Sequence, residues 1–147
     1  GKCTRFQSCF AFSHVLVKME HKEQAEKEKE QISQHYFKIL ELFNSRNVYE
    51  IEKMVTANSM YMSPGSLLSH GMKEALNECR AIADETDTAH LPWVNTIEGF
   101  PVIKPEAAVF TVISTNGELF HRGMMVYLKQ GEVWKHHILI FNDVPKP

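Results

Sequence analysis

The sequence predicts an α+β domain in which helices come first and a sheet comes last. Apolar residues recur at helical spacing before Asp84, whereas the last third of the chain holds three apolar segments rich in β-branched and aromatic residues. Only short polar turns separate these three segments, as in hairpins. A chain that segregates its helices from its strands in this way covers one face of the sheet with the helices.

A single apolar stripe predicts a long first helix. The stripe repeats at steps of one helical turn and comprises Ile32, Tyr36, Ile39, Leu40 and Phe43. The segment 20–30 that precedes it consists almost wholly of Glu, Lys, Gln and Ala, which are good helix formers. We expect this segment to be a solvated lead-in to the helix, and the alternative interpretation is an interaction arm.

A second, short helix is expected after a break at residues 44–47. Asn47 and Glu50 have the spacing of a capping box with Asn in place of Ser. The side of this helix that we expect to be buried comprises Ile51, Met54 and Val55. Residues 60–63 then predict a short strand, which the turn dipeptide Pro64-Gly65 stops.

A third helix is expected after Gly71, followed by a polar connector at 84–90. The apolar face of this helix comprises Met72, Ala75, Leu76, Cys79 and Ile82 or Ala83. The next strand is expected over 93–103, bent or interrupted at Gly99 and Pro101, because glycine and proline weaken a central position of a ladder.

The three remaining strands are expected over 107–114, 119–128 and 133–141. The turns that join them, Thr115-Asn116-Gly117 and Lys129-Gln130-Gly131, carry glycine at the end of each tight connection. Strands joined by such short turns pair with their sequence neighbours in opposite directions, so the end of the chain predicts an antiparallel meander.

Composition excludes several classes of protein. The chain has 147 residues, of which 44% are hydrophobic and 23% charged, so one ordered globular domain is expected. A formal net charge of -2 gives no reason to expect a nucleic-acid partner. No apolar run approaches the roughly 20 residues that a membrane helix needs, so we expect a soluble protein without a membrane partner.

The first 18 residues differ from the rest, since no acidic residue occurs before Glu20. We expect residues 1–18 to be an N-terminal extension of uncertain order and 19–147 to be a single domain. The extension is either the remnant of an organelle-targeting sequence or residues upstream of a natural start at Met19. The three cysteines lack the paired spacing of a zinc site or a disulfide framework, so we expect a reducing compartment. That compartment is the cytoplasm, with the mitochondrion as the alternative.

Four short segments resemble the nuclear transport factor 2-like superfamily, whose members include ketosteroid isomerase, scytalone dehydratase, the SnoaL-like polyketide cyclases and the association domain of calmodulin-dependent kinase II. The segments are Asn44-Ser45-Arg46-Asn47, Asn58 to Pro64, His70-Gly71-Met72 and Gly131-Glu132-Val133-Trp134-Lys135. The resemblance spans roughly residues 31 to 142 and lies in the order of elements more than in any motif. It implies a cone-shaped barrel, in which a curved antiparallel sheet wraps around a long N-terminal helix, with two further helices and an apolar cavity.

Dimerisation through the outer face of the sheet is also implied by the resemblance. Residues 124–128 and 138–141 are apolar at consecutive positions, which is typical of strands buried on both faces. Gly99, Pro101 and Gly123 are places where the sheet could bend into a cone. We therefore expect a homodimer.

The positions that carry catalysis in the family's isomerases hold other residues here. The carboxylate base precedes the proline that ends the first strand, and this chain has Ser63 before Pro64. The positions of the phenol and of the second carboxylic acid correspond to about Ile39 and Met125. A hydroxyl cannot replace a carboxylate as a proton-abstracting base, so no catalytic residue is assigned.

Strand parity, combined with the resemblance, predicts the lining of the cavity. Alternate residues of a strand share a face, which groups His121 with Tyr127 on one strand and Trp134 with His136 on the next. The expected ligand-pocket residues are His121, Tyr127, His136, Tyr36, Tyr61, Met125, Trp134 and Ile138. Adjacent His136 and His137 point to opposite faces, so no metal site is predicted, and no cofactor is expected.

Three functional interpretations follow. We expect a protein that binds a small apolar molecule in the cone, with His121, Tyr127 and His136 placing its polar atom. One alternative is a lyase or isomerase in which a pocket histidine acts as general acid or base, with Glu98, Glu118 or Asp143 as its carboxylate partner. The other is a dimerisation or protein-interaction module without a ligand. The sequence therefore leaves open whether the protein is an enzyme.

Overall fold

The computed structural model describes residues 4–62, 70–71, 74–77 and 92–145. In chain order its elements are α1 (Thr4–Asn44), α2 (Val48–Ile51), the 3-10 helix η1 (Glu52–Met54), β1 (Val55–Met62), β2 (His70–Gly71), β3 (Val94–Ile103), β4 (Ala107–Thr115), β5 (Phe120–Gln130) and β6 (Val133–Asp143). Residues 74–77 are also helical, and Ala75 and Leu76 of the expected third helix are buried. Met72, Cys79, Ile82, Ala83, Ser63 and Pro64 lie outside the described residues.

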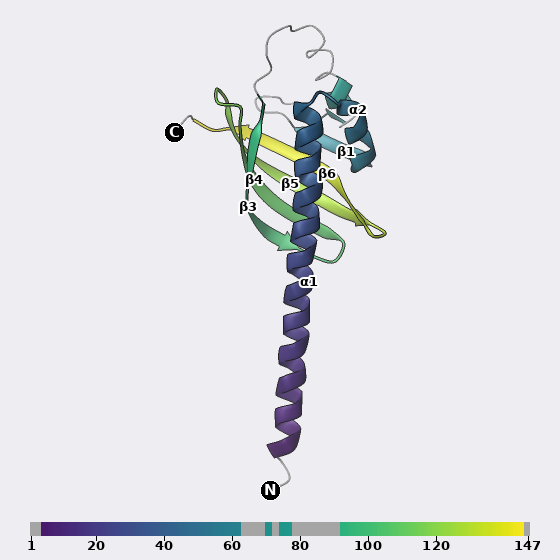
Figure 1. Cartoon of the computed structure of the whole chain (residues 1–147), viewed down its shortest axis with the longest axis vertical. Helices are drawn as coiled ribbons and strands as arrows, with labels where there is room; N and C mark the ends of the chain where they lie inside the picture. The colour runs from purple at the N-terminus through teal and green to yellow at the C-terminus, as the bar shows by residue number, and fades with distance from the viewer. Residues whose placement is uncertain (1–3, 63–69, 72–73, 78–91, 146–147) are drawn as a thin grey trace.

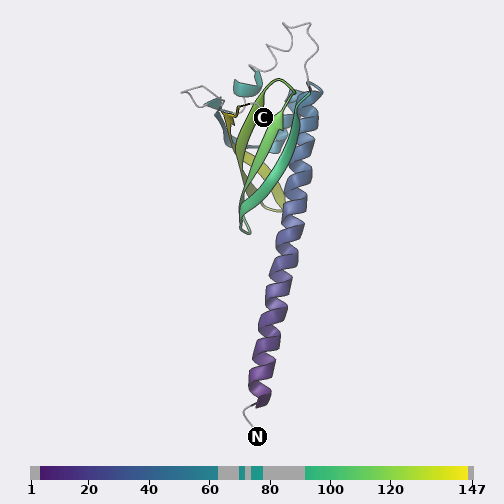
Figure 2. The same ribbon diagram turned by 90° about the vertical axis from the view of Figure 1, so that its left-hand side faces the viewer.

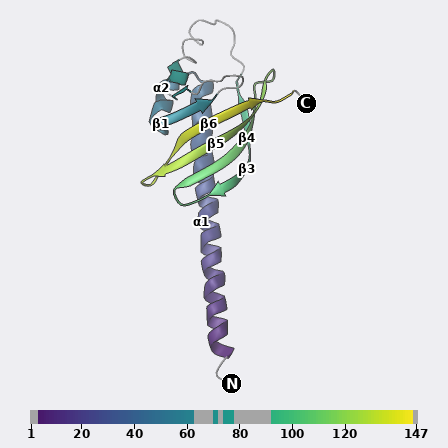
Figure 3. The ribbon, with the colours of Figure 1, turned by 180° about the vertical axis from the view of Figure 1, so that it is seen from behind.

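The strands form one curved sheet in the order β2-β1-β6-β5-β4-β3, and α1 crosses one face of it (Figures 1 and 3). β3 to β6 pair in antiparallel, as the meander predicts. β1 lies parallel to β6, however, so the expectation of a wholly antiparallel sheet is wrong. Tight hairpins impose antiparallel pairing only on strands that follow one another, whereas a long connection separates β1 from β6.

α1 is one continuous helix of 41 residues, about 60 Å long. It passes through the boundary expected between residues 18 and 19, and its N-terminal half extends beyond the sheet (Figure 2). The side chains of residues 13–24 are all exposed, and the first buried one is Glu28. Among the described residues, no helix combines the length and the apolarity needed to cross a membrane.

Glu28 fastens α1 to the hairpin between β5 and β6. Its carboxylate accepts hydrogen bonds from Lys129 Nζ (2.9 Å), Gln24 Nε2 (2.7 Å) and Trp134 Nε1. Burial acts to raise the pKa of Glu28, but these hydrogen bonds outweigh it, so the pKa lies below the ordinary value of 4.5. The expected solvated lead-in therefore contains one buried, charged anchor.

The break after α1 occurs where the sequence predicts it, at the turn of residues 45–46. Asn47 makes no side-chain capping bond to α2, and its backbone (φ -90°, ψ 56°) lies outside the extended region usual for that role, so the predicted capping box is wrong. Asn44 has a tertiary role instead. Its side chain donates to the Trp93 carbonyl (2.8 Å) and accepts from the Trp93 amide (2.9 Å), which ties the end of α1 to the start of β3.

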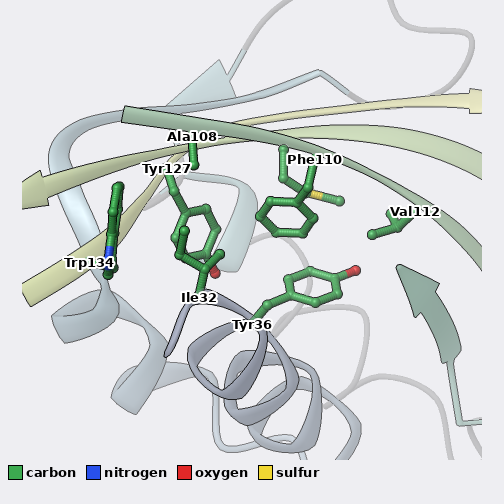
Figure 4. Close-up of a cluster of buried hydrophobic side chains, with 8 residues drawn as sticks. Ile32, Tyr36, Ala108, Phe110, Val112, Tyr127 and Trp134 are labelled. Carbon is green, nitrogen blue, oxygen red and sulfur yellow. The ribbon is translucent and has the colours of Figure 1, made fainter. Parts of the chain in front are cut away.

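The core lies between α1 and the concave face of the sheet. Figure 4 shows Ile32 and Tyr36 of α1 facing Phe110, Tyr127 and Trp134 of the strands, and all five are at most 5% exposed. A second cluster lies near the end of α1 and comprises Leu42, Ile51, Val55 and Leu76. Ile39 and Phe43 of the predicted stripe pack against this second cluster, whereas its buried α1 residue, Leu42, was not part of that stripe.

A bulge in β6 changes which residues face the core. Tyr127 pairs with His136 but Val126 pairs with Ile138, so His137 is an extra residue in the ladder. Beyond the bulge the alternation of faces is reversed. Leu139 and Phe141 consequently pack against the core, whereas Ile138, which was expected inside, turns to the outer face.

Irregular pairing in β3 occurs on both sides of Gly99, as expected from Gly99 and Pro101. Gly123 does not interrupt its ladders. A Cβ atom at Gly123 would lie 2.4 Å from Phe141 Cε1, so this glycine makes room for the aromatic ring. Gly123 therefore contributes close packing against Phe141.

Candidate functional site

A cavity of about 170 Å³ lies between the C-terminal half of α1 and the concave face of the sheet. Its lining comprises Tyr36, Ile39, Leu40, Phe43, Ile51, Val55, Tyr61, Ala75, Leu76, Trp93, Asn95, Ser114, His121, Met125, His136, Leu139 and Phe141. Most of this surface is apolar, with a few polar groups at separate points, as is usual for small-molecule sites. Ile39 and Met125, the positions of the isomerase phenol and acid in the resemblance, both lie on this lining and are apolar.

The first polar group is a chain of hydrogen bonds formed by Tyr36, Asn95 and Ser114. Ser114 Oγ donates to Asn95 Oδ1 (2.6 Å), and Asn95 Nδ2 donates to the Tyr36 hydroxyl oxygen. Asn95 and Ser114 are paired across β3 and β4, which places their side chains on the same face. Burial raises the pKa of Tyr36 to about 12, so its hydroxyl stays protonated and can serve as a donor.

The second polar group is His121, which lies opposite Asp143 on the neighbouring strand. His121 Nε2 is 3.1 Å from Asp143 Oδ1, and the His121 side chain is 13% exposed while that of Asp143 is 71% exposed. The Trp93 ring stacks on the imidazole with a centroid distance of 5.0 Å. Of the three carboxylates considered from sequence, Asp143 is therefore the one that pairs with His121. Glu98 pairs with Arg122 instead.

The third polar group is His136, which is 3% exposed. Neither of its ring nitrogens has a hydrogen-bond partner among the described residues. Burial, together with the smaller effects of the nearby His35 and His137, lowers its pKa to about 3, so the imidazole is neutral at physiological pH. A buried polar group without a partner is rare in native proteins and calls for an explanation.

Five of the eight residues expected in the pocket line the cavity: Tyr36, Tyr61, His121, Met125 and His136. Tyr127 does not, because its fully buried hydroxyl is hydrogen-bonded to His35 Nδ1 (3.0 Å) beneath the helix. Trp134 does not, because its indole is held by Glu28. Ile138 does not, because the bulge at His137 turns it outward.

Asn95, Ser114 and Trp93 are lining residues that the sequence interpretation missed. Parity contained a signal for Ser114, since it shares a strand face with the buried residues Phe110 and Val112. No comparable signal marks Trp93, which precedes β3 and reaches the cavity by stacking on His121. Its position depends on the hydrogen bonds from Asn44, which join segments far apart in the sequence.

His136 and His137 have separate environments. His137 Nδ1 is hydrogen-bonded to the hydroxyl of Thr56 (2.8 Å) on β1, whereas His136 lines the cavity. Within the described part of the chain, no group of three His, Cys, Asp or Glu side chains is arranged to hold a metal ion.

Solved structures share this architecture. No family model matches the sequence, and no curated protein matches it. An NTF2-like protein of unknown function from Silicibacter pomeroyi has a TM-score of 0.65 at 10% identity, covering 81% of this chain and 98% of that one. A domain of unknown function with a cystatin-like fold from Nostoc punctiforme has a TM-score of 0.66 at 11% identity, with 80% and 78% covered. A dehydratase candidate of the NTF2-like family from Streptomyces avermitilis has a TM-score of 0.63 at 12% identity, with 83% and 99% covered.

These similarities define the class of protein by its fold. The chain has the nuclear transport factor 2-like fold, and the resemblance drawn from its sequence is confirmed at that level. Identities of 10–12% carry the fold and leave the chemistry to be argued from this chain's own cavity.

Proposed function

We propose that the protein binds a small, largely apolar molecule in the cavity beneath α1. The observation that supports this proposal is an apolar cavity of about 170 Å³ with polar groups at three separate points of its lining. An engineered cavity of about 150 Å³ in another protein is large enough to hold benzene, so the volume suits one ring with a few further atoms. The polar groups would orient such a molecule, and the apolar lining would supply most of the affinity.

Toluene is a suitable probe, because it tests the apolar cavity alone. We expect saturable binding of toluene to the full chain in an NMR titration, and loss of binding in Met125→Trp, which fills the cavity. The matched control is Met124→Trp, since Met124 is on the same strand but 45% exposed on the outer face. Leu139→Phe is a milder filling variant in case Met125→Trp does not fold. Equal toluene binding by both the filling variants and the control contradicts the proposal.

A second candidate function is acid–base catalysis by His121, favoured by the position of Asp143. An imidazole oriented by a carboxylate at 3.1 Å, on the lining of an apolar cavity, has the arrangement of a general acid or base. The similar structure from Streptomyces avermitilis is named as a dehydratase candidate, and dehydration also requires proton transfer.

Proton abstraction next to a carbonyl group tests this candidate directly. We expect the protein to accelerate deuterium uptake by cyclohexanone in D₂O, and His121→Asn to abolish the acceleration. His14→Asn is the control, since His14 lies on the exposed part of α1. Uptake at the rate of buffer alone, or equal acceleration by His121→Asn, removes the catalytic interpretation and leaves the binding function.

We also propose that the outer face of the sheet forms a homodimer. After the bulge, Ile138 and Ile140 lie across from Val126 and Met124 respectively, which creates an apolar patch on that face. Met124 is 45% exposed, and exposed apolar patches on a folded domain mark interaction surfaces. Sedimentation equilibrium should show a dimer that Met124→Lys dissociates and that Val133→Lys, at the exposed β5–β6 hairpin, leaves intact. A monomeric wild-type protein would contradict this proposal.

A further inference from the structure

His136 is a buried group to which no described residue of the chain gives a hydrogen bond. It is 3% exposed, it lines the cavity, and both nitrogens lack partners among the described residues. The nearest polar neighbour across the strand pair is Tyr127, whose ring meets the imidazole edge to face at a centroid distance of 5.5 Å. The Tyr127 hydroxyl is already hydrogen-bonded to His35, so it is not available to His136.

The other surroundings of His136 on the sheet are apolar. Val55 lies beside it on β1, and the next pair of β5 and β6 on the same face of the sheet is Met125 with Leu139. All three line the cavity together with His136. Since no described residue supplies a hydrogen-bond partner for the imidazole, the cavity that it lines is where a bound molecule could supply one.

We propose, building on the cavity-binding function above, that His136 anchors the hydroxyl group of an uncharged single-ring ligand such as a phenol or a cyclic alcohol. A neutral imidazole has one donor and one acceptor nitrogen, and a hydroxyl group can satisfy either. The gain in binding free energy is large at a buried site, because the ligand supplies a hydrogen bond that His136 lacks and does not displace an existing one.

The charges around the cavity favour an uncharged ligand. The described lining contains no Lys or Arg to neutralise a carboxylate or a phosphate. The titratable groups nearest to His136 are His35, His137 and Tyr127. Burial lowers the pKa of His35 to about 4, with the positive charge of Lys135 adding to the effect, so it is uncharged at neutral pH.

The two histidines of the cavity occupy widely separated positions along the β5–β6 pair, which separates this anchor from the candidate acid–base group. His136 pairs with Tyr127, and Asp143 pairs with His121, six residues earlier on β5. Six residues of an extended strand span about 20 Å. A single-ring ligand held by His136 therefore lies at the opposite end of the described lining from His121.

Three matched probes test the inference on the full chain: phenol, toluene and benzoate. We expect phenol to bind about tenfold more tightly than toluene, benzoate to bind more weakly than either, and the imidazole resonances of His136 to shift on phenol binding. His136→Leu should reduce phenol affinity to that of toluene while toluene affinity stays similar. His137→Leu is the control and should keep the preference for phenol, because His137 does not line the cavity.

The outcomes separate the anchor from the cavity. If toluene and phenol bind equally and His136→Leu changes neither, an ordered water satisfies His136 and the anchoring role is refuted while the cavity function stands. Preferred binding of benzoate also refutes the inference, because it shows an anion site. If none of the three probes binds the wild-type chain, the cavity function fails first and the anchor fails with it.

Discussion

The two adjacent histidines of β6 should respond to the same substitution with opposite changes in stability. His136 is buried without a hydrogen bond to any residue that the structure describes, whereas His137 satisfies the buried hydroxyl of Thr56, which is 2% exposed. Leucine has a volume similar to that of histidine and carries no polar atom. His136→Leu therefore removes an unsatisfied group, and His137→Leu creates one.

The expected magnitudes follow from the cost of an unsatisfied buried polar group, about 1–3 kcal/mol. His136→Leu should raise the free energy of unfolding of the ligand-free protein by about 1–3 kcal/mol at pH 7. His137→Leu should lower it by a similar amount, since Thr56 loses its partner. The assay is urea denaturation followed by circular dichroism, with the slope of the free energy against urea concentration compared among the three proteins.

The dependence of stability on pH gives a second measure of His136. The folded-state pKa is about 3 and the ordinary value 6.5, so below pH 6.5 the unfolded chain takes up a proton that the folded protein does not. This group's contribution is complete above pH 6.5 and is lost as pH falls toward 3, by about 1.4 kcal/mol per pH unit. His136→Leu should therefore lose less stability than wild type between pH 7 and pH 5. Destabilisation by His136→Leu with an unchanged pH profile would refute the reasoning, because it would show that His136 is satisfied in the ligand-free protein.

Three other substitutions test the packing and the polar links. Glu28→Gln should lessen the loss of thermal stability in acid, because the lowered pKa of Glu28 makes its contribution complete above pH 4.5 and lost as pH falls through the folded value; an unchanged acid profile in calorimetry would contradict this. Gly123→Ala should cost about 1–3 kcal/mol in urea denaturation, since the added Cβ atom collides with Phe141, and wild-type stability would show that the ring moves freely. Asn95→Ala should cost about 1–3 kcal/mol by unpairing the hydroxyls of Tyr36 and Ser114, whereas an unchanged midpoint would mean that water replaces the amide.

Local patterns were sufficient for α1 and for the last three strands, but not for β1, which begins at Val55, a residue expected on the second helix, and not at Met60. Helical spacing located the stripe on α1, and glycines in polar turns located the hairpins of β4, β5 and β6. Both signals depend on residues within a few positions of one another, so they can be read along the chain. The direction of β1 against β6 could not be predicted in this way, because strands separated by a long connection can pair in either direction.

The candidate site was likewise predicted correctly only where a local pattern was sufficient. Alternation along β5 correctly brought His121 and Met125 to the cavity, because no extra residue interrupts that strand's pairing with β4. On β6 the same rule failed at Ile138, since a bulge at His137 reverses the alternation of faces. The residues around His137 contain no sequence pattern that predicts this bulge.

The sequence by itself determined α1 and the three strands of the C-terminal meander, together with the apolar stripe of the helix, because these properties arise from neighbours one turn or two residues away. Tertiary structure alone decided that Glu28 is buried, that Asp143 lies beside His121 and that His136 has no hydrogen-bond partner in the described part of the chain. Each of these facts concerns groups brought together from distant parts of the chain. Whether a polar side chain is satisfied depends on what packs against it, and that is settled only when the sheet closes over α1.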